Sequence, residues 1–240
     1  MTKHTPGPIP KLALEDVTSG YGPIAIVKSL SLLIRPGEIF ALMGKNGMGK
    51  TTLLKTVLGV VPVRSGDIRL DGKSILGTPP KTHVAAGVGY APQEQPLFQD
   101  LSVRDNLRLA VQSDKMLDAP LERVFGHFPF LKDRLGQKAG TLSGGEQKML
   151  IIARALMLGP DLLLIDEISE GLQPTVIARI AEALCAERAQ NGTTILLVEQ
   201  NLNFALEVAD RWAVLKMGEI DDSGDVGEGT RGRVLEHLKI

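Results

Sequence analysis

The chain has 240 residues, of which 43% are hydrophobic and 23% are charged, and its formal net charge is −1. This length allows one large domain or a core with a subdomain, and the near-neutral charge excludes a field strong enough to attract nucleic acid or anionic lipid. The single cysteine, Cys185, excludes an internal disulfide, suits a reducing compartment and is expected at a packed helix position. The sequence contains no apolar run of about 18 residues, so no membrane-spanning helix is predicted. Residues 1–10 lack the apolar segment of a signal peptide, and we expect a flexible leader there.

The pattern of apolar residues predicts strands and helices that alternate around one helical segment. Two strands near the start of the chain are expected to form an antiparallel edge, whereas the later short apolar runs are typical of strands buried on both faces. Residues 102–159 are expected to be mostly helical, with interruptions at Pro120, Pro129 and Gly136. The expected strands cover residues 12–17, 25–34, 39–43, 68–70, 88–90, 162–165, 194–198 and 212–216, and the expected helices cover 51–58 and 174–190.

A glycine-rich loop follows the third expected strand. Residues 44–51, with the sequence GKNGMGKT, match the P-loop pattern GxxxxGK[ST]. Glycines let consecutive backbone N–H groups turn toward phosphate oxygens, and the helix that begins there adds the positive end of its dipole. Lys50 is expected to reach the β- and γ-phosphates, and Thr51 is expected to hold Mg²⁺ through its hydroxyl. The alternative is an ordinary glycine turn, which the position between a buried strand and a helix disfavours.

A second apolar strand ends in two carboxylates, Asp166 and Glu167. The carboxyl ends of strands in α/β sheets are where ligands bind. Asp166 is expected to complete the Mg²⁺ shell, and Glu167 is expected to act as the general base on the attacking water. The alternative is that two acids merely end a strand. Together these elements predict an α/β fold: a P-loop NTPase core (11–92 and 160–240) with a parallel sheet and an antiparallel β edge, and a helical subdomain (93–159), within one domain over 11–240.

The third motif is LSGGEQ at residues 142–147. Ser143 and Glu146 fit the capping box S-x-x-E, so a helix is expected to begin at Ser143 and to stop at Gly159 and Pro160. The free N–H groups at such a helix start attract an anion. A helix cap without any ligand role is the alternative.

With these motifs, the chain is similar to the ATP-binding cassette (ABC) ATPases of membrane transporters from about Leu12 onward. It looks most like the subunits of branched-chain amino acid and urea-type importers, on the segments NGMGKTTLL (46–54), GLQP (171–174) and LVEQN (197–201). The resemblance implies that LSGGEQ binds the γ-phosphate of a nucleotide held by a partner subunit. It also implies that Tyr21 stacks on adenine and that Gln93 senses Mg²⁺ and the attacking water, with residues 94–98 touching the membrane subunit. Tyr21 as a turn aromatic and Gln93 as a loop amide are the alternatives.

Three residues depart from the pattern of the family. Gln200 stands where a histidine usually contacts the γ-phosphate, Gln173 replaces a common aspartate, and Met48 fills a slot usually taken by a small residue. A glutamine donates a hydrogen bond but does not titrate near neutral pH, so we expect slow basal ATP hydrolysis. The variants at 200 and 173 also occur in the importer subgroup and sharpen the likeness to it.

The resemblance therefore implies an ATPase subunit that powers an importer of amino acids or related small polar solutes such as urea, with ATP and Mg²⁺ as cofactors. Its expected partners are a second ATPase subunit (the same or a sibling chain), transmembrane permease subunits and, indirectly, a periplasmic solute-binding protein, but no nucleic acid. It is expected at the cytoplasmic face of the cell membrane as a peripheral protein. The alternatives are a soluble ABC ATPase of DNA repair or translation, and a P-loop kinase, which leaves LSGGEQ unexplained. The implied site residues are, as catalytic groups, Glu167, Lys50, Gln200 and Gln93; as nucleotide-binding groups, Tyr21, Gly44, Asn46, Gly47, Gly49, Lys50, Thr51, Thr52, Ser143, Gly144 and Gly145; and as metal-binding groups, Thr51, Gln93 and Asp166.

The remaining residues of note are assigned structural roles. The four histidines (His4, His83, His127 and His237) lack metal-ligand spacing and are expected on the surface or in the subdomain, and Trp212 is expected to be partly buried in a strand.

Overall fold

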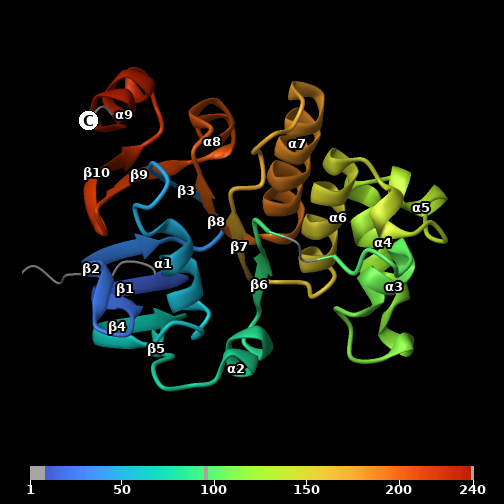
Figure 1. The fold of residues 1–240 in the computed structure, drawn as a ribbon, viewed down its shortest axis with the longest axis horizontal. Coiled ribbons are helices and arrows are strands. Elements are labelled where there is room, and N and C mark those ends of the chain that lie inside the picture. Colours follow the sequence, from blue (N-terminus) through green and yellow to red (C-terminus); the bar gives the residue numbers. More distant parts are fainter. Residues whose placement is uncertain (1–8, 95–96, 239–240) are drawn as a thin grey trace, which may run out of the picture.

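The computed structural model describes residues 9–94 and 97–238, and its strands form two sheets (Figure 1). The six-stranded sheet has the order β10-β9-β3-β8-β7-β6, and all its neighbours are parallel except the antiparallel pair β9–β10. The four-stranded sheet has the order β2-β1-β4-β5 and is antiparallel throughout. The strands are β1 (Leu12–Tyr21), β2 (Ile24–Ile34), β3 (Ile39–Met43), β4 (Val63–Leu70), β5 (Lys73–Ser74), β6 (Val88–Ala91), β7 (Leu162–Asp166), β8 (Thr194–Glu199), β9 (Arg211–Lys216) and β10 (Glu219–Asp225).

The apolar runs of the parallel sheet are buried on both faces. Along β7, Leu162 and Leu164 belong to the cluster that the sheet shares with α1 and the antiparallel strands, whereas Leu163 and Ile165 belong to the cluster shared with α6 and α7. This alternation is the period of two that a strand imposes on its side chains. The α-helices are α1 (Lys50–Val57), α2 (Pro80–Ala85), α3 (Val103–Arg108), α4 (Asp118–His127), α5 (Phe130–Asp133), α6 (Gly144–Leu156), α7 (Pro174–Asn191), α8 (Leu202–Val208) and α9 (Thr230–Leu238).

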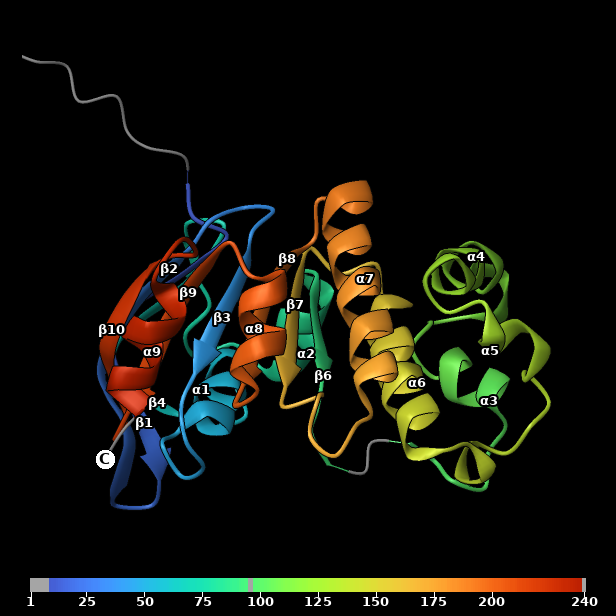
Figure 2. The ribbon, with the colours of Figure 1, turned by 90° about the horizontal axis from the view of Figure 1, so that it is seen from above.

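The helices α3 to α6 gather at one end of the molecule, away from the antiparallel sheet (Figures 1 and 2). Helix α7 lies between this group and the rest of the parallel sheet, and α4 packs against it. This arrangement agrees with the expected helical segment, and its boundaries at residues 93 and 159 stay a prediction.

A buried carboxylate joins α4 to α7. The Glu187 side chain has no exposed surface, and it accepts hydrogen bonds from Arg123 and from Thr193 (2.6 Å) and pairs with His127 (2.9 Å). Burial alone would raise the pKa of Glu187, but the hydrogen bonds from His127, Arg123 and Thr193 outweigh it and lower the pKa from 4.5 to about 2.

Several local expectations are wrong. Pro120 does not interrupt a helix but occupies the third position of α4, where a backbone N–H has no acceptor within the helix and a proline is tolerated. Trp212 is fully buried, and His83 is neither on the surface nor in the subdomain: it is 2% exposed and its ring bonds Val57 O and Thr78 Oγ1, both at 2.8 Å.

Other elements lie beyond the expected ones, namely the start of β4 and the whole of β5, β10, α2, α8 and α9. Residues 1–8 of the expected leader and His4 lie outside the described residues. Within residues 9–94 and 97–238, no helix is long and apolar enough to cross a membrane.

Candidate active site

The glycine-rich loop connects β3 to α1 as expected. Gly47 and Gly49 have φ angles of 78° and 102°, in the left-handed region that favours glycine. At Gly44 a Cβ atom would lie 2.6 Å from the backbone oxygen of Leu215, so no larger residue fits without moving β9. These contacts hold the loop in a tight curve at the start of α1, where the backbone N–H groups are free to meet an anion.

Lys50 is buried beneath this loop. Its Nζ donates to the carbonyl oxygens of Gly44 (2.7 Å) and Lys45 (2.8 Å) and lies 2.9 Å from Oε1 of Glu167. The ammonium therefore balances the charge of the expected base, and the two side chains are 3% and 5% exposed. An arriving phosphate would compete with Glu167 for this charge.

The hydroxyl of Thr51 and the carboxylate of Asp166 come together as the sequence predicts. Thr51 Oγ1 donates to Asp166 Oδ1 (3.1 Å), and the Tyr90 hydroxyl donates to Oδ2 (3.2 Å). Burial raises the pKa of Asp166, although these two hydrogen bonds oppose the shift. The pKa of Tyr90 is also raised, mainly by burial and then by the nearby charge of Asp166. Mg²⁺ is usually held by one or two protein oxygens together with substrate phosphates and water. The pair fits that chemistry, because it brings one hydroxyl and one carboxylate oxygen together beside the P-loop.

Two glutamine amides converge on Glu167. Its Oε2 accepts from Gln93 Nε2 (3.1 Å) and from Gln200 Nε2 (2.8 Å). Gln200 Nε2 also donates to Asn46 Oδ1 (2.6 Å), so it bridges the P-loop and the expected base. Both oxygens of Glu167 are thus occupied, and its backbone has a φ of 44°.

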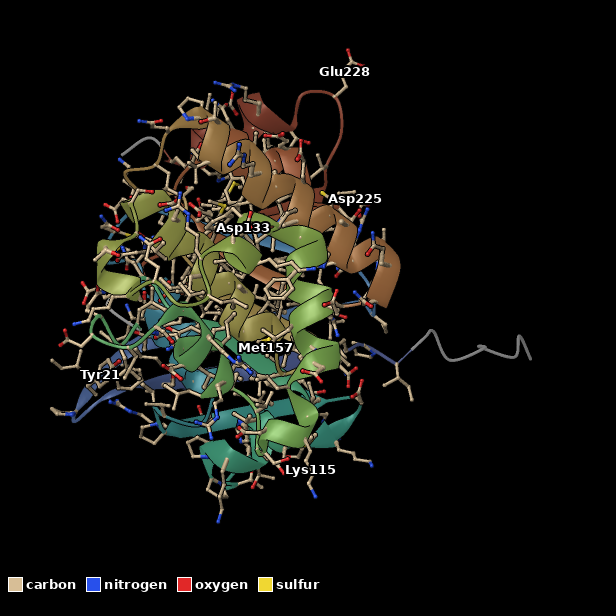
Figure 3. The ribbon with its side chains drawn as sticks, turned by 90° about the vertical axis from the view of Figure 1, so that its right-hand side faces the viewer. Tyr21, Lys115, Asp133, Met157, Asp225 and Glu228 are labelled. Carbon is tan, nitrogen blue, oxygen red and sulfur yellow. The ribbon has the colours of Figure 1, made fainter. Side chains whose placement is uncertain are left out.

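Tyr21 lies at the rim of this site. A depression of about 470 Å³ is lined by its ring, by Ile26, by the P-loop, and by Gln93 and Glu167. The Tyr21 side chain is half exposed, and Figure 3 shows it at the edge of the molecule beside the blue strands. A flat, exposed aromatic ring beside a loop of the phosphate-binding type is suited to stacking on the adenine of a nucleotide.

The signature motif begins α6 as expected. Ser143 Oγ accepts from Glu146 N (3.4 Å), and Glu146 Oε2 accepts from Ser143 N (2.9 Å), which completes the predicted capping box. The hydrogen bond from the backbone N–H of Ser143, together with one from the Ser143 hydroxyl to Glu146 Oε2 (2.8 Å), lowers the pKa of Glu146 against the opposing effect of burial. At Gly145 a Cβ atom would lie 2.9 Å from Cγ2 of Val176, so a larger residue fits only if the Val176 side chain moves.

The signature motif is not part of the P-loop depression. Ser143 and Gly144 are exposed, and none of Ser143, Gly144 and Gly145 lines that depression. That these residues act on a nucleotide held by a partner subunit stays a prediction.

Sequence reasoning missed several polar residues around the site. Glu199 is buried and accepts from Ser169 N (3.0 Å) and Ser169 Oγ (2.8 Å), and burial raises its pKa. Tyr90 could have been found, because it is a polar residue in a buried strand one position before the end of β6. Lys148 and Glu170, which both contact Gln93, show no such signal.

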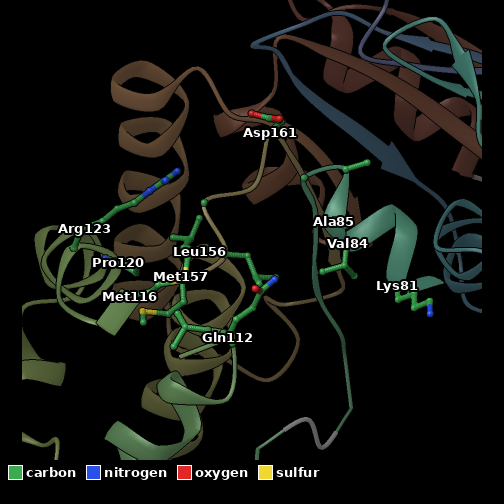
Figure 4. A pocket seen from close by; sticks show the side chains of 17 residues that line it. Lys81, Val84, Ala85, Gln112, Met116, Pro120, Arg123, Leu156, Met157 and Asp161 are labelled. Atoms are coloured by element: carbon green, nitrogen blue, oxygen red, sulfur yellow. The ribbon is translucent and has the colours of Figure 1, made fainter. Parts of the chain in front are cut away.

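A larger hollow of about 800 Å³ separates α2 from the subdomain helices (Figure 4). Val84 comes from α2 on one side, and Met116 and Pro120 come from the subdomain on the other, with Leu158 among the lining residues. Val84, Met116 and Leu158 are exposed apolar residues. Lys81 and Asp161 are exposed charged residues in the same lining, so the exposed walls of the hollow carry both apolar and charged groups.

The family is shown by the sequence match. The profile described as ABC transporter matches residues 27–170, more than half of the chain, and this stretch contains the P-loop, the signature motif and the pair Asp166 and Glu167. This chain belongs to the ABC transporter family. The expected ATP-hydrolysing ABC ATPase and its α/β fold are thereby confirmed.

Relatives in this family span nearly the whole chain. The high-affinity branched-chain amino acid transport ATP-binding protein BraG of Pseudomonas aeruginosa is 41% identical and covers 87% of this chain and 90% of its own length. The probable branched-chain amino acid transport ATP-binding protein LivF of Archaeoglobus fulgidus is 36% identical over 93% and 94% of the two chains. The lipopolysaccharide export system ATP-binding protein LptB of Escherichia coli is 33% identical over 95% of both.

The fold is shared with solved structures of ABC cassettes. A nucleotide-free ATP-binding cassette from an ABC transporter superimposes with a TM-score of 0.87 at 22% identity, over 94% of this chain and 95% of that chain. The roles of individual site residues stay predictions within this family assignment.

Proposed function

We propose that the chain is the ATP-hydrolysing subunit of an importer for branched-chain amino acids or related small polar solutes such as urea. The names of two relatives, with identities of 41% and 36%, support amino-acid transport, and the relative named for lipopolysaccharide export is less similar at 33%. The importer-like segments at 171–174 and 197–201 support the same choice. The single observation that carries the ATPase part is the convergence of Lys50, Gln93 and Gln200 on Glu167.

The residues of the site are assigned these roles. The P-loop and Lys50 bind the phosphates, and Lys50 leaves Glu167 for the β- and γ-phosphates when ATP enters. Glu167, released from this ion pair, accepts a proton from the attacking water, which Gln93 and Gln200 help to orient. Thr51, Asp166 and Gln93 would hold Mg²⁺, which when bound offsets the negative charge that develops on the phosphates. Tyr21 holds the adenine at the rim.

The exposed signature motif calls for a second subunit. We place Ser143, Gly144 and Gly145 over the γ-phosphate of ATP bound by a second ATPase subunit, the same chain or a sibling, in a head-to-tail dimer. Closure of this dimer would move the permease subunits between two access states.

The permease subunits would dock beside the hollow of Figure 4 and on residues 94–98. Phe98 is exposed there, and residues 95 and 96 lie outside the described part of the chain. This docking places the protein at the cytoplasmic face of the membrane. A periplasmic solute-binding protein would act through the permeases and not on this chain.

The variant Glu167→Gln tests this function. It keeps the shape of the side chain and removes the base, so ATP should bind without turnover and trap the dimer. We expect a dimer on gel filtration with ATP and Mg²⁺, and a monomer without ATP. Glu182→Gln, at an exposed position of α7, is the matched control and should not trap a dimer. A Glu167→Gln chain that stays monomeric with ATP at high concentration would contradict the dimer, and uptake of labelled leucine or urea by the reconstituted complex tests the solute.

A further inference from the structure

Gln93 is held at both of its ends by residues outside the family motifs. Its backbone oxygen accepts from Lys148 Nζ (2.7 Å), and its side-chain Nε2 donates to Glu170 Oε2 (2.9 Å) as well as to Glu167 Oε2 (3.1 Å). Glu170 lies in the loop after β7 and Lys148 lies on α6. Three separate parts of the chain therefore meet at this one glutamine.

The two carboxylates fix the orientation of the Gln93 amide. An ionised carboxylate only accepts hydrogen bonds, and an amide has donors on one side and an acceptor oxygen on the other. With both N–H groups directed at Glu167 and Glu170, the Oε1 atom must face away from them. A flipped amide would place this oxygen against two negative charges. The arrangement thus leaves Oε1 free to accept a hydrogen bond or to contact a cation.

Lys148 ties the backbone of Gln93 to the signature helix. It lies five positions after Ser143, on the same helix α6, and its side chain is half-buried. Burial lowers the pKa of Lys148, and the nearby carboxylates of Glu170 and Glu199 oppose this effect. Because the hydrogen bond ends on a backbone oxygen, a movement of α6 is passed directly to the loop that carries Gln93.

We infer that Lys148 and Glu170 are positioning residues that present the Oε1 atom of Gln93 to the Mg²⁺ of bound ATP and couple it to the signature helix. Glu170 selects the orientation of the Gln93 side-chain amide, and Lys148 fixes the position of the Gln93 backbone. Neither residue touches the reacting atoms. The inference rests on the proposed function, because it assumes that Mg²⁺ and ATP bind beside Gln93.

The test is the affinity for ATP measured with Mg²⁺ and with EDTA, by a binding titration on the full chain. Outer-shell partners of metal ligands typically change metal affinity by about 10- to 100-fold. We expect Glu170→Ala and Lys148→Met to reduce the Mg²⁺-dependent gain in affinity by about tenfold and to leave the affinity in EDTA unchanged. Lys148→Arg keeps a donor and should retain most of the gain. Glu170→Gln keeps an acceptor oxygen for Gln93 Nε2, and the carboxylate of Glu167 still disfavours the flipped amide, so this variant should also retain most of the gain.

These variants separate positioning from simple charge attraction. If the charge of Glu170 merely attracts Mg²⁺, Glu170→Gln will lose as much as Glu170→Ala, and that result overturns the inference. The inference is also overturned if Glu170→Ala and Lys148→Met lose the same ATP affinity with Mg²⁺ as with EDTA. It is likewise overturned if they lose no more affinity than the exposed control Glu182→Ala. A parent chain whose ATP affinity does not depend on Mg²⁺ would instead overturn the proposed function, and the inference with it.

Discussion

Replacing Glu187 by glutamine tests the joint between α4 and α7. The variant keeps the size of the side chain and removes the charge that Arg123 and His127 contact. The lowering of the Glu187 pKa from 4.5 to about 2, taken at about 1.4 kcal/mol per pH unit, makes the ionised carboxylate worth about 3 kcal/mol to the folded state. Removing one partner of a buried ion pair typically costs about 3–5 kcal/mol, which agrees in size.

The pH dependence gives this prediction its sharpest form. Because the folded-state pKa is depressed, the stabilisation is fully present above pH 4.5 and is lost as the pH falls toward 2. At a pH one unit below 4.5, the parent should have lost about 1.4 kcal/mol of it, whereas the glutamine variant has no such charge to lose. The difference in the free energy of unfolding between the parent and Glu187→Gln should therefore be smaller at this pH than at pH 7 by about 1.4 kcal/mol.

Urea unfolding of both proteins at the two pH values measures this difference. Other acid-linked effects are common to parent and variant and cancel in the difference. Glu182→Gln, on an exposed position of the same helix, should change the free energy of unfolding by no more than about 0.5 kcal/mol. The reasoning would be refuted if Glu187→Gln lowered the free energy of unfolding by less than about 1 kcal/mol. It would also be refuted if the parent and the variant differed in this free energy by the same amount at both pH values.

Two further predictions concern the nucleotide site. Gln200→His should raise the basal rate of ATP hydrolysis by the isolated chain, because an imidazole can carry a charge beside the γ-phosphate; a rate no higher than that of the parent would remove Gln200 as the cause of slow turnover. Tyr21→Ala should weaken ATP binding by up to about tenfold through the loss of stacking, whereas Tyr21→Phe should retain the affinity. Equal affinities of the alanine variant and the parent would exclude Tyr21 as the adenine platform.

The strands that carry the site were predictable because of where they lie. Every residue of β3, β7 and β8 is buried, so their apolar runs stand out in the sequence. Strand β10 gives no such signal, because Glu219–Asp225 contains four acidic residues and one apolar residue and exposes alternate positions. Its strand geometry comes from pairing with β9, a tertiary effect.

The same distinction applies to the site. Residues within the motifs are close in sequence, so their type and spacing predict their chemistry. The partners of Gln93 are distant: Glu170 lies 77 positions away and Lys148 lies 55 positions away. The Glu187 joint likewise brings together residues 64 positions apart. Such pairs depend on how the subdomain docks, and no local pattern in one sequence reports this.

The backbone conformation of Glu167 is itself unfavourable to the stability of the fold. Its φ of 44° belongs to the left-handed region, where a side chain other than glycine or asparagine costs on the order of 1 kcal/mol. A glycine would relieve this cost, but it would also leave the buried ammonium of Lys50 without its carboxylate partner, which typically costs about 3–5 kcal/mol. The residue that hydrolysis needs is therefore also one that the fold needs, and a lineage released from ATP hydrolysis would gain no stability by losing this glutamate unless it lost Lys50 as well.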